Sequence, residues 1–444
     1  MTSACYHCRQ SGRTRRDFLR MGALTFLGLN SAEYFRLRAA AGTSAKPAKA
    51  QACILLWLEG GISHVDSWDV KSASGFKAIS TNVPGVQVSE LLPKVSKHMD
   101  KLAIIRSMKT QERNHPQATI ETLTGHRPNP ALKFPSFGSI ISKELGLRDN
   151  MPPYAVVPMP TEGDFFSYED AYKAAWIGSE YDGMILPDPS KPGFSVPDLS
   201  LPKTISAGAI EDGRALMQIV DRHFREKEQS AEFAKLDAFE EQALRMILSP
   251  HVKNAFDLSQ ESDQTKDKYG RDRVGQAALL GRRLVEAGCR FVTVAGYRHG
   301  AWDTHADNDK NLRDKLTPVL DRTVSALLED LKQRGLLEST VVIVTGEFGR
   351  TPVVNPNRGR DHWPDCWSMV LGGGGIQGGQ IVGASDAQGT YVTDRPVSIG
   401  DIYATVYKAM GIEWDKTYMS PIGRPVYIAN GFDDTPGMPI KELI

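Results

Sequence analysis

The pattern of apolar and polar positions along the chain predicts strands that alternate with helices. Short apolar runs end at glycines or polar turns, and longer stretches with helical spacing separate several of them. Apolar runs of this length are typical of strands buried on both faces, as in a parallel sheet covered by helices. The predicted strands are residues 53–58, 102–105, 154–157, 290–294, 340–344 and 368–371.

Three stretches carry the clearest helical spacing, at residues 271–287, 310–334 and 401–410. Strands separated by helices of this length predict an α/β fold, with a mostly parallel sheet and helices on both faces. Residues 211–260 are highly charged and poor in glycine, which indicates a helical insertion at the surface. The stretch 158–205 is long and rich in Pro, Gly, Asp and Tyr, and a loop of this length is usually functional or a lid.

The N-terminal residues resemble a twin-arginine export signal. Arg15 and Arg16 precede a modest apolar stretch, and small residues follow. We therefore expect a signal segment over residues 1–41, a linker over 42–50 and one domain over 51–444. The protein would be periplasmic or otherwise exported, with the twin-arginine export machinery as a partner. The alternative is an amphipathic N-terminal helix on a cytoplasmic protein.

Charge and composition exclude several classes of protein. Lys+Arg and Asp+Glu both number 53, so the chain lacks the basic surface that nucleic acid binding requires. No apolar run reaches the roughly 18–20 residues of a transmembrane span. Cys53 and Cys289 lie in apolar runs and are predicted to be buried, and no disulfide framework is visible among the five cysteines. A nucleotide-binding oxidoreductase is excluded because no GxGxxG follows the first predicted strand. An α/β enzyme or an enzyme-like binding protein remains.

Candidate chemistry follows three of the predicted strands. In an open parallel sheet, ligands bind beyond the carboxyl ends of the strands. The segments 59–69, 297–307 and 346–364 follow such ends and hold four of the ten histidines, together with carboxylates. These histidines are His64, His299, His305 and His362. Zinc and manganese sites use imidazole and carboxylate ligands, and paired metals serve phosphoryl and sulfuryl transfer. The pattern therefore indicates a divalent-metal site.

Each of these motifs also has a purely structural interpretation. An isolated Asp-x-His, as at 303–305, is more often a capped turn than a metal site, and Glu347 could form a buried ion pair with Arg350. The Asp-His pair at 361–362 could hydrogen-bond across a loop. Arg350 and Arg360 could clamp an oxyanion bidentately or form structural ion pairs. The coincidence of three such segments after predicted strands favours the metal site.

Several longer segments resemble the bacterial family called domain of unknown function 1501. They are GGISHVDSWDVK (60–71), NHPQATIETLTGHRP (114–128), AWDTHADN (301–308), TGEFGRTPVVN (345–355), GRDHWP (359–364) and GGGGIQGGQIVGASD (372–386). The family is grouped with the alkaline phosphatase-like superfamily, which includes sulfatases. The resemblance implies a three-layer α/β/α sandwich with a mostly parallel central sheet. It also implies one or two divalent metals, drawn from Zn, Mn, Ca or Mg.

The resemblance also implies roles for particular residues. The positions similar to the superfamily's metal ligands are Glu59 or Asp66, Asp303, His305, Glu347, Asp361 and His362. Asn114 and His115 stand where the superfamily places a Cys, Ser or Thr nucleophile, and Arg350 would stabilise the charge of the transferred group. Phe348 stands where a further histidine is expected, which leaves one metal site short of a ligand.

The function implied is an exported, metal-dependent hydrolase of sulfate or phosphate esters. Its substrate would be a small-molecule or glycan ester. Because neither Asn114 nor His115 is an ordinary nucleophile for this reaction, a metal-activated water or an atypical group at that position would replace it. The alternative is a non-catalytic binding protein of the cell surface or periplasm on the same fold.

Overall fold

The computed structural model describes residues 48–158, 169–196, 243, 245–298 and 300–444. The predicted signal over 1–41, most of the linker, most of the helical insertion over 211–260 and His299 lie outside the described residues. Part of the predicted lid over 158–205 also lies outside them. Residues Lys49–Ile444 form one compact unit, and all the elements below belong to it.

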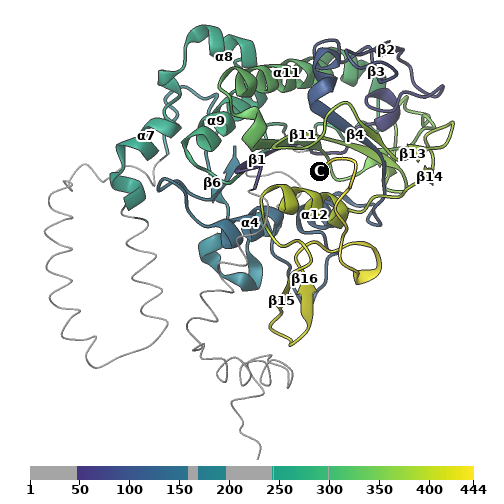
Figure 1. Cartoon of the computed structure of the whole chain (residues 1–444). Helices are drawn as coiled ribbons and strands as arrows, with labels where there is room; N and C mark the ends of the chain where they lie inside the picture. The colour runs from purple at the N-terminus through teal and green to yellow at the C-terminus, as the bar shows by residue number, and fades with distance from the viewer. Residues whose placement is uncertain (1–47, 159–168, 197–242, 244, 299) are drawn as a thin grey trace, which may run out of the picture. The chain divides into compact units, whose positions relative to one another are not determined.

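An eight-stranded sheet crosses this unit in the order β12-β4-β11-β8-β1-β7-β5-β6 (Figure 1). Among its described strands only β11 runs antiparallel to its neighbours, β4 and β8, so the sheet is mostly parallel as predicted. All six predicted strands lie in it. In chain order the strands are β1 (Ala52–Trp57), β4 (Leu102–Met108), β5 (Tyr154–Val157), β6 (Met184–Ile185), β7 (Phe291–Val294), β8 (Thr340–Thr345), β11 (Trp367–Gly373) and β12 (Ile381–Val382).

Helices cover both faces of the sheet. In the described part of the chain they are α3 (His115–Thr124), α4 (Phe137–Leu145), α7 (Pro250–Phe256), α8 (Asp263–Tyr269), α9 (Arg273–Ala287), α10 (Asn308–Asn311), α11 (Thr317–Gln333) and α12 (Ile399–Ala409). The single helix predicted over 310–334 is instead α10, one π-helical turn (Leu312–Leu316) and α11. Pro318 explains the division, because proline has no N–H to donate and is tolerated only in the first turn of a helix.

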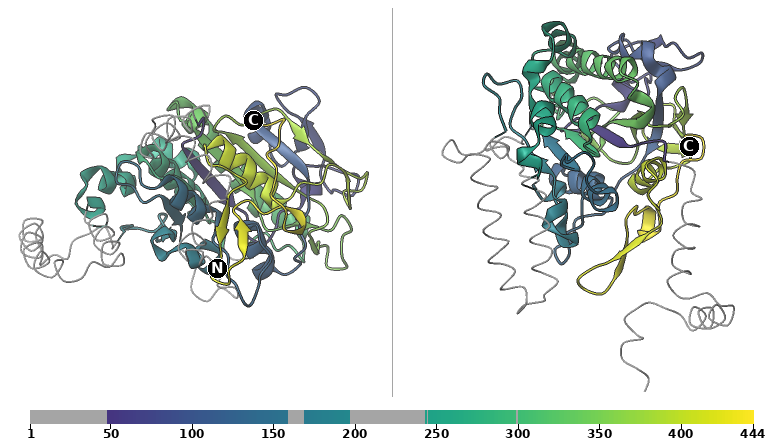
Figure 2. Two further views of the ribbon diagram at one scale, coloured as in Figure 1. Left: turned by 60° about the horizontal axis from the view of Figure 1, so that its bottom comes forward. Right: turned by 60° about the vertical axis from the view of Figure 1, so that its left-hand side comes forward.

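Side chains that alternate along β1 divide the core into two clusters. Ile54 and Leu56 pack in a cluster with residues of α9 and α11, whereas Leu55 and Trp57 pack in a second cluster with residues of α4 and α12. This is the period-two alternation of a strand whose two faces are both buried. The views in Figures 1 and 2 place these helix pairs on opposite faces, which confirms the predicted three-layer α/β/α sandwich.

Shorter elements decorate the sandwich. Two-stranded pairs are β2 (Ala78–Ser80) with β3 (Gln87–Ser89), β9 (Gly349–Arg350) with β10 (His362–Trp363), β13 (Ala384–Ser385) with β14 (Val392–Asp394), and β15 (Thr417–Met419) with β16 (Pro425–Tyr427). Short 3-10 turns occupy His64–Asp66, Val95–Lys101, Glu169–Tyr172, Ala175–Ile177, Ser179–Tyr181, Leu258–Gln260, Leu337–Ser339 and Phe432–Asp434. Within the described ranges, no helix combines the length and the apolar character that a membrane crossing needs. Cys53 and Cys289 are buried, as predicted.

The carboxyl ends of the parallel strands meet at one edge of the sheet. The chain leaves this edge after β1 toward Gly60, after β4 toward His115, after β7 toward Asp303 and after β8 toward Glu347. Because β11 runs the opposite way, the segment that leads into it also lies at this edge. That segment contains His362, so five separate parts of the chain converge here.

Candidate metal centre

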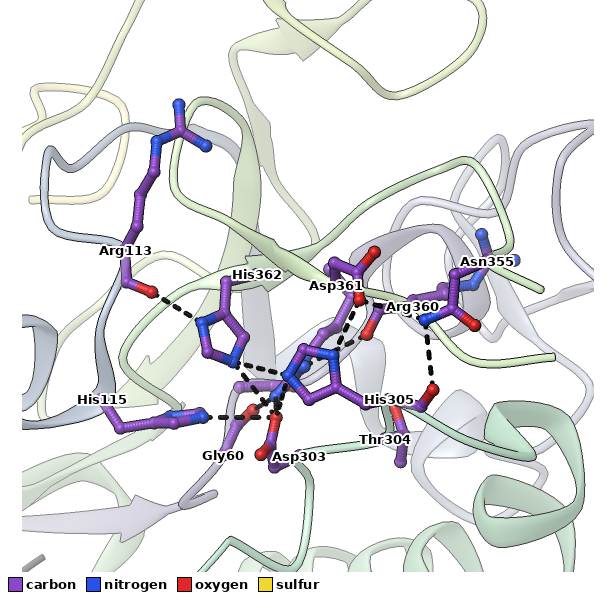
Figure 3. A network of polar contacts seen from close by, with 12 residues as sticks. Gly60, Arg113, His115, Asp303, Thr304, His305, Asn355, Arg360, Asp361 and His362 are labelled. Carbon is purple, nitrogen blue, oxygen red and sulfur yellow. Dashed lines mark hydrogen bonds and ion pairs between the residues drawn. The ribbon is translucent and has the colours of Figure 1, made fainter. Parts of the chain in front are cut away.

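Two histidines and an aspartate form a group at this edge that could hold a metal ion. His115, Asp303 and His362 each offer one ligand atom, and these atoms lie within 4.8 Å of one another. His115 is the first residue of α3, Asp303 lies in the loop between β7 and α10, and His362 begins β10. Figure 3 shows both imidazole rings directed at the Asp303 carboxylate.

Both imidazoles of this group are held in place by their second nitrogen. His115 Nδ1 lies 2.5 Å from Glu347 Oε1, and its Nε2 lies 3.2 Å from Asp303 Oδ1. His362 Nδ1 lies 2.6 Å from the carbonyl oxygen of Arg113, and its Nε2 lies 3.2 Å from the same Asp303 oxygen. Metal-binding histidines characteristically anchor one ring nitrogen on a carboxylate or carbonyl and present the other to the ion. The donor set and its support therefore fit a divalent cation.

Glu347, which supports His115, depends on a glycine after β1. The Gly60 N–H donates to both carboxylate oxygens of Glu347, at 2.9 and 3.1 Å. Gly60 has a φ of +109°, and a Cβ at this position would lie 2.4 Å from the Asp303 nitrogen. Only glycine permits so close an approach in this backbone region. The glycine thus lets the segments that carry Glu347 and Asp303 pack against the end of β1.

Arg350 holds the Asp303 carboxylate from the buried side. Its Nη2 donates to Asp303 Oδ1 at 2.6 Å and also to the Gly60 carbonyl, while its Nε donates to the Gly61 carbonyl at 3.1 Å. Its Nη1 donates to the carbonyl of Arg360 at 3.2 Å. The guanidinium is fully buried, and each of its nitrogens donates to a protein oxygen. An oxyanion clamp by Arg350 would require the release of these bonds, so its observed position is that of a support for Asp303.

The charges within the group shift the pKa values of His115 and Asp303 in opposite directions. Burial alone would lower the pKa of His115, but the hydrogen bonds from its ring to Asp303 and Glu347 outweigh burial and raise the pKa to about 9. Burial would likewise raise the pKa of Asp303, but bonds from His115 and His362 and the charge of Arg350 hold that pKa well below its usual range. The two carboxylates thus favour positive charge at His115, and a metal ion that binds its Nε2 must displace any proton held there.

His305 and Asp361 lie on the open side of the group. His305 Nε2 is 3.0 Å from Asp303 Oδ1 and 2.9 Å from His362 Nε2, and its Nδ1 is 2.7 Å from Asp361 Oδ1. The Asn355 amide donates to the same Asp361 oxygen at 3.0 Å. Bonds from His305 and Asn355 lower the pKa of Asp361 below its usual value. The His305 side chain is 43% exposed, so it is the imidazole of the centre most open to solvent.

The remaining residues singled out in the sequence lie in different surroundings. Asp66 is fully buried and forms a two-point ion pair with Arg360, at 2.7 and 3.1 Å. Its oxygens also accept bonds from Ser63 at 2.7 Å, Ser74 at 2.8 Å and the Asn308 amide at 3.0 Å. The structure therefore holds Asp66 in a buried network away from the His115, Asp303 and His362 ligand atoms.

Glu59 and Asn114 contribute backbone groups to the surroundings of the centre. Glu59 is buried, and its carbonyl accepts a bond from the Trp302 N–H at 2.9 Å, which fixes the chain just before Asp303. Asn114 is the N-cap residue of α3, with extended backbone and no capping bond from its side chain. His115, matched by sequence to a nucleophile position, lies in the structure within the group that could hold a metal ion. The one sequence signal for this was its place between a strand end and a helix start.

Comparisons with solved structures identify proteins of similar fold. The chain is similar to the zinc-bound C-terminal periplasmic domain of EcEptC from Escherichia coli, with 12% identity, a TM-score of 0.41, and 89% of this chain and 92% of that chain covered. A protein in the alkaline phosphatase superfamily from Vibrio parahaemolyticus gives 12% identity, a TM-score of 0.39, and coverages of 83% and 68%. The PsFucS1 sulfatase from Pseudoalteromonas sp. gives 15% identity and a TM-score of 0.35, with 82% of this chain and 69% of that chain covered.

No curated protein matches the sequence. The model of one protein family, described as "Protein of unknown function (DUF1501)", matches residues 50–444, which include every element of the fold and every residue of the centre. The chain therefore belongs to the DUF1501 family.

Proposed function

We propose that this protein is an exported, metal-dependent hydrolase of sulfate or phosphate esters, with His115, Asp303 and His362 as metal ligands. One observation carries the proposal: two imidazoles are anchored through Nδ1 and present Nε2 to a single carboxylate oxygen. This donor set suits zinc or manganese better than the harder magnesium and calcium ions. A divalent cation held there would neutralise negative charge on the oxygens of the sulfuryl or phosphoryl group.

In this proposal the chain's other polar residues position the ligands and move protons. Glu347 orients His115, the Arg113 carbonyl orients His362, and Arg350 fixes Asp303. These are positioning roles, because each group acts through a ligand rather than on the substrate.

His305 is the group we assign to proton transfer, since it is exposed and its Nδ1 is anchored on Asp361. The water oxygen forms a bond to sulfur or phosphorus, and the bond from that atom to the ester oxygen breaks. His305 Nε2 takes the proton from the attacking water and delivers it to the oxygen of the departing alcohol.

A second function is favoured by the residues at the position of the superfamily's nucleophile. Asn114 caps α3 through its backbone, and both nitrogens of His115 face carboxylates. Neither residue is an ordinary nucleophile for ester hydrolysis. A non-catalytic binding protein that keeps the metal centre would be consistent with this arrangement.

Metal content and turnover, measured together, separate the two functions. We would determine metal by elemental analysis and turnover on 4-nitrophenyl phosphate and 4-nitrophenyl sulfate, for wild type, His115→Ala and His362→Ala. His98→Ala is the matched control, because His98 hydrogen-bonds to Ser325 and Glu329 and lies outside the metal-ligating group. If the protein is a hydrolase, wild type and His98→Ala should bind metal and turn over an ester. Both metal content and turnover should fall in His115→Ala and His362→Ala. Bound metal without turnover would favour the binding protein, and a folded protein without metal would refute the centre.

The export part of the proposal rests on Arg15 and Arg16 and the apolar stretch that follows them. Cell fractionation of wild type and of the Arg15→Lys/Arg16→Lys variant tests it. Export by the twin-arginine route requires that the variant accumulate in the cytoplasm while wild type does not. An unchanged distribution would refute the route and leave the metal centre unaffected.

A further inference from the structure

The side chain of Asn355, in the turn between β9 and β10, joins two loops on the open side of the centre. Its Nδ2 donates to the His305 carbonyl at 3.1 Å and to Asp361 Oδ1 at 3.0 Å. Its Oδ1 accepts the N–H groups of Asn357 at 3.0 Å and Gly359 at 2.9 Å. Figure 3 shows the amide beside the Asp361 carboxylate and the carbonyl of His305. Both donors and both lone pairs of the amide are therefore used inside the protein.

The backbone partners of Asn355 determine which way its amide faces. A backbone N–H can only donate, so the amide atom that Asn357 and Gly359 both reach has to be the oxygen. The nitrogen, which can only donate, then faces Asp361. A half-turn of the amide would set the nitrogen against two N–H groups and the oxygen against a carbonyl and a carboxylate. The chain's own groups therefore fix a donor beside Asp361.

This donor bears on which nitrogen of His305 carries the proton. The Asp361 side chain is 55% exposed, so its carboxylate is ionised at neutral pH and can only accept hydrogen bonds. The oxygen that accepts from Asn355 also lies 2.7 Å from His305 Nδ1. The proton of the neutral ring is therefore on Nδ1, and Nε2 keeps a lone pair. Nε2 is the atom to which the proposed function assigns proton transfer.

Backbone contacts hold the two loops together independently of the Asn355 nitrogen. The Asp307 N–H donates to the carbonyl of Asn357 at 3.0 Å. A Cβ at Gly359 would lie 2.0 Å from the His305 carbonyl oxygen, so the loops pack backbone to backbone and only glycine fits there. Loss of the Nδ2 donor should therefore leave the loops packed and act on the Asp361 carboxylate.

We propose that Asn355 is a positioning residue for proton transfer. Its Nδ2 holds the exposed Asp361 carboxylate in place as the acceptor for His305 Nδ1, which keeps Nε2 available to take the proton of the attacking water. Without this second bond the carboxylate is free to turn into solvent, and either ring nitrogen of His305 can carry the proton. The inference rests on the proposed function, because it concerns how the base of that reaction is held.

The test compares two substitutions of Asn355 with a control in the same turn. Asn355→Asp keeps an oxygen for the two backbone N–H groups and replaces the donor by a second acceptor, which repels Asp361. Asn355→Ala removes the whole amide. Asn357→Ala is the control, because Asn357 is exposed and bonds to Asn355 through its backbone N–H. For each zinc-loaded full chain we would measure metal content, kcat and KM on 4-nitrophenyl phosphate and 4-nitrophenyl sulfate, and the His305 tautomer by nitrogen NMR of histidine-labelled protein.

We expect kcat to fall about 10–100-fold in Asn355→Asp and Asn355→Ala, with metal content and KM as in wild type. The His305 signals should change from the Nδ1–H form to a mixture of both tautomers, and Asn357→Ala should match wild type throughout. Wild-type kcat and tautomer in both Asn355 variants would overturn the inference while the hydrolase stands. Loss of metal, or an effect of Asn355→Ala that Asn355→Asp lacks, would also overturn it, since either would show support of the centre or the loop.

The NMR measurement also separates this inference from the proposed hydrolase. If wild type binds zinc but hydrolyses neither ester, the hydrolase is refuted. A tautomer change confined to the two Asn355 variants would still support the positioning of His305 by Asn355. An unchanged tautomer in such a protein would overturn both.

Discussion

The buried ion pair of Asp66 and Arg360 offers a sharp test of how this site is held together. Both side chains are 0% exposed, and Arg360 binds both oxygens of Asp66. Arg360→Met would leave a charged carboxylate in the interior, which typically costs about 3–5 kcal/mol of folding free energy. Ser63, Ser74 and Asn308 still donate to that carboxylate, so we expect a value near the lower end, about 3 kcal/mol.

Backbone carbonyls add to this cost. The Arg360 guanidinium also donates to the carbonyls of Ala73 at 2.8 Å, Thr351 at 3.0 Å and Pro352. Each of these three carbonyls that loses its partner and stays buried adds about 1 kcal/mol, which brings the expected loss of folding free energy to about 6 kcal/mol. The assay is urea unfolding of Arg360→Met, Asp66→Leu and the double variant, with metal content determined for Asp66→Asn.

The two singles should be coupled by at least about 2 kcal/mol, because the double variant leaves no unpaired charge. Asp66→Asn should keep its metal, since Asp66 serves Arg360 rather than the centre. Additive effects of the two single variants would refute the ion-pair reasoning. Loss of metal in Asp66→Asn would instead support the ligand role that the family resemblance implied for Asp66.

Three further outcomes follow from the structure. Gly60→Ala should lower the free energy of unfolding by at least about 2 kcal/mol, because alanine disfavours a positive φ and its Cβ would meet Asp303; a melting temperature within a degree of wild type would contradict this. Glu347→Gln should weaken metal affinity about 10–100-fold by loosening His115, and a titration with zinc that matches wild type would exclude that support. Burial, opposed by a backbone hydrogen bond, lowers the pKa of His126 to about 4, whereas in the unfolded chain it is about 6.5. Stability should therefore fall as the pH drops from about 6.5 to about 4, by about 3 kcal/mol in total from this group, and urea midpoints of His126→Phe should lack that part of the slope.

The main strands of the sheet can be predicted from the sequence because each is a continuous run of apolar residues. An exposed strand or loop would instead contain polar residues on its solvent side. It does not predict the direction of β11. An apolar run does not show whether its strand will run parallel or antiparallel to its neighbours. The direction of β11 is set by the β9–β10 pair, which follows β8 and returns the chain antiparallel to it. The interruption before α11 could have been predicted from Pro318, since proline in a helix interior removes a backbone donor.

The sequence also predicts part of the metal centre, because its residues follow the ends of predicted strands. Residues after strand ends meet at one edge, so Asp303 and the histidines near it could be expected to lie together. Which partner each polar group finds is decided by contacts distant in sequence. His115 meets Glu347 across 232 positions, and Arg350 meets the carbonyl of Gly60 across 290. Local spacing contains no signal for such pairs.

Short connections join the β9–β10 pair to the central strands β8 and β11, and this restricts where homologous chains can differ in length. Three residues separate the end of β8 from β9, and three separate β10 from β11. An insertion or deletion in either connection would shift His362 against Asp303, because neither core strand can slide without exposing its apolar side chains. The turn between β9 and β10 is under no such restriction at Val353 and Val354, which are 78% and 48% exposed. Homologous chains should therefore differ in length at this turn while the two short connections stay constant.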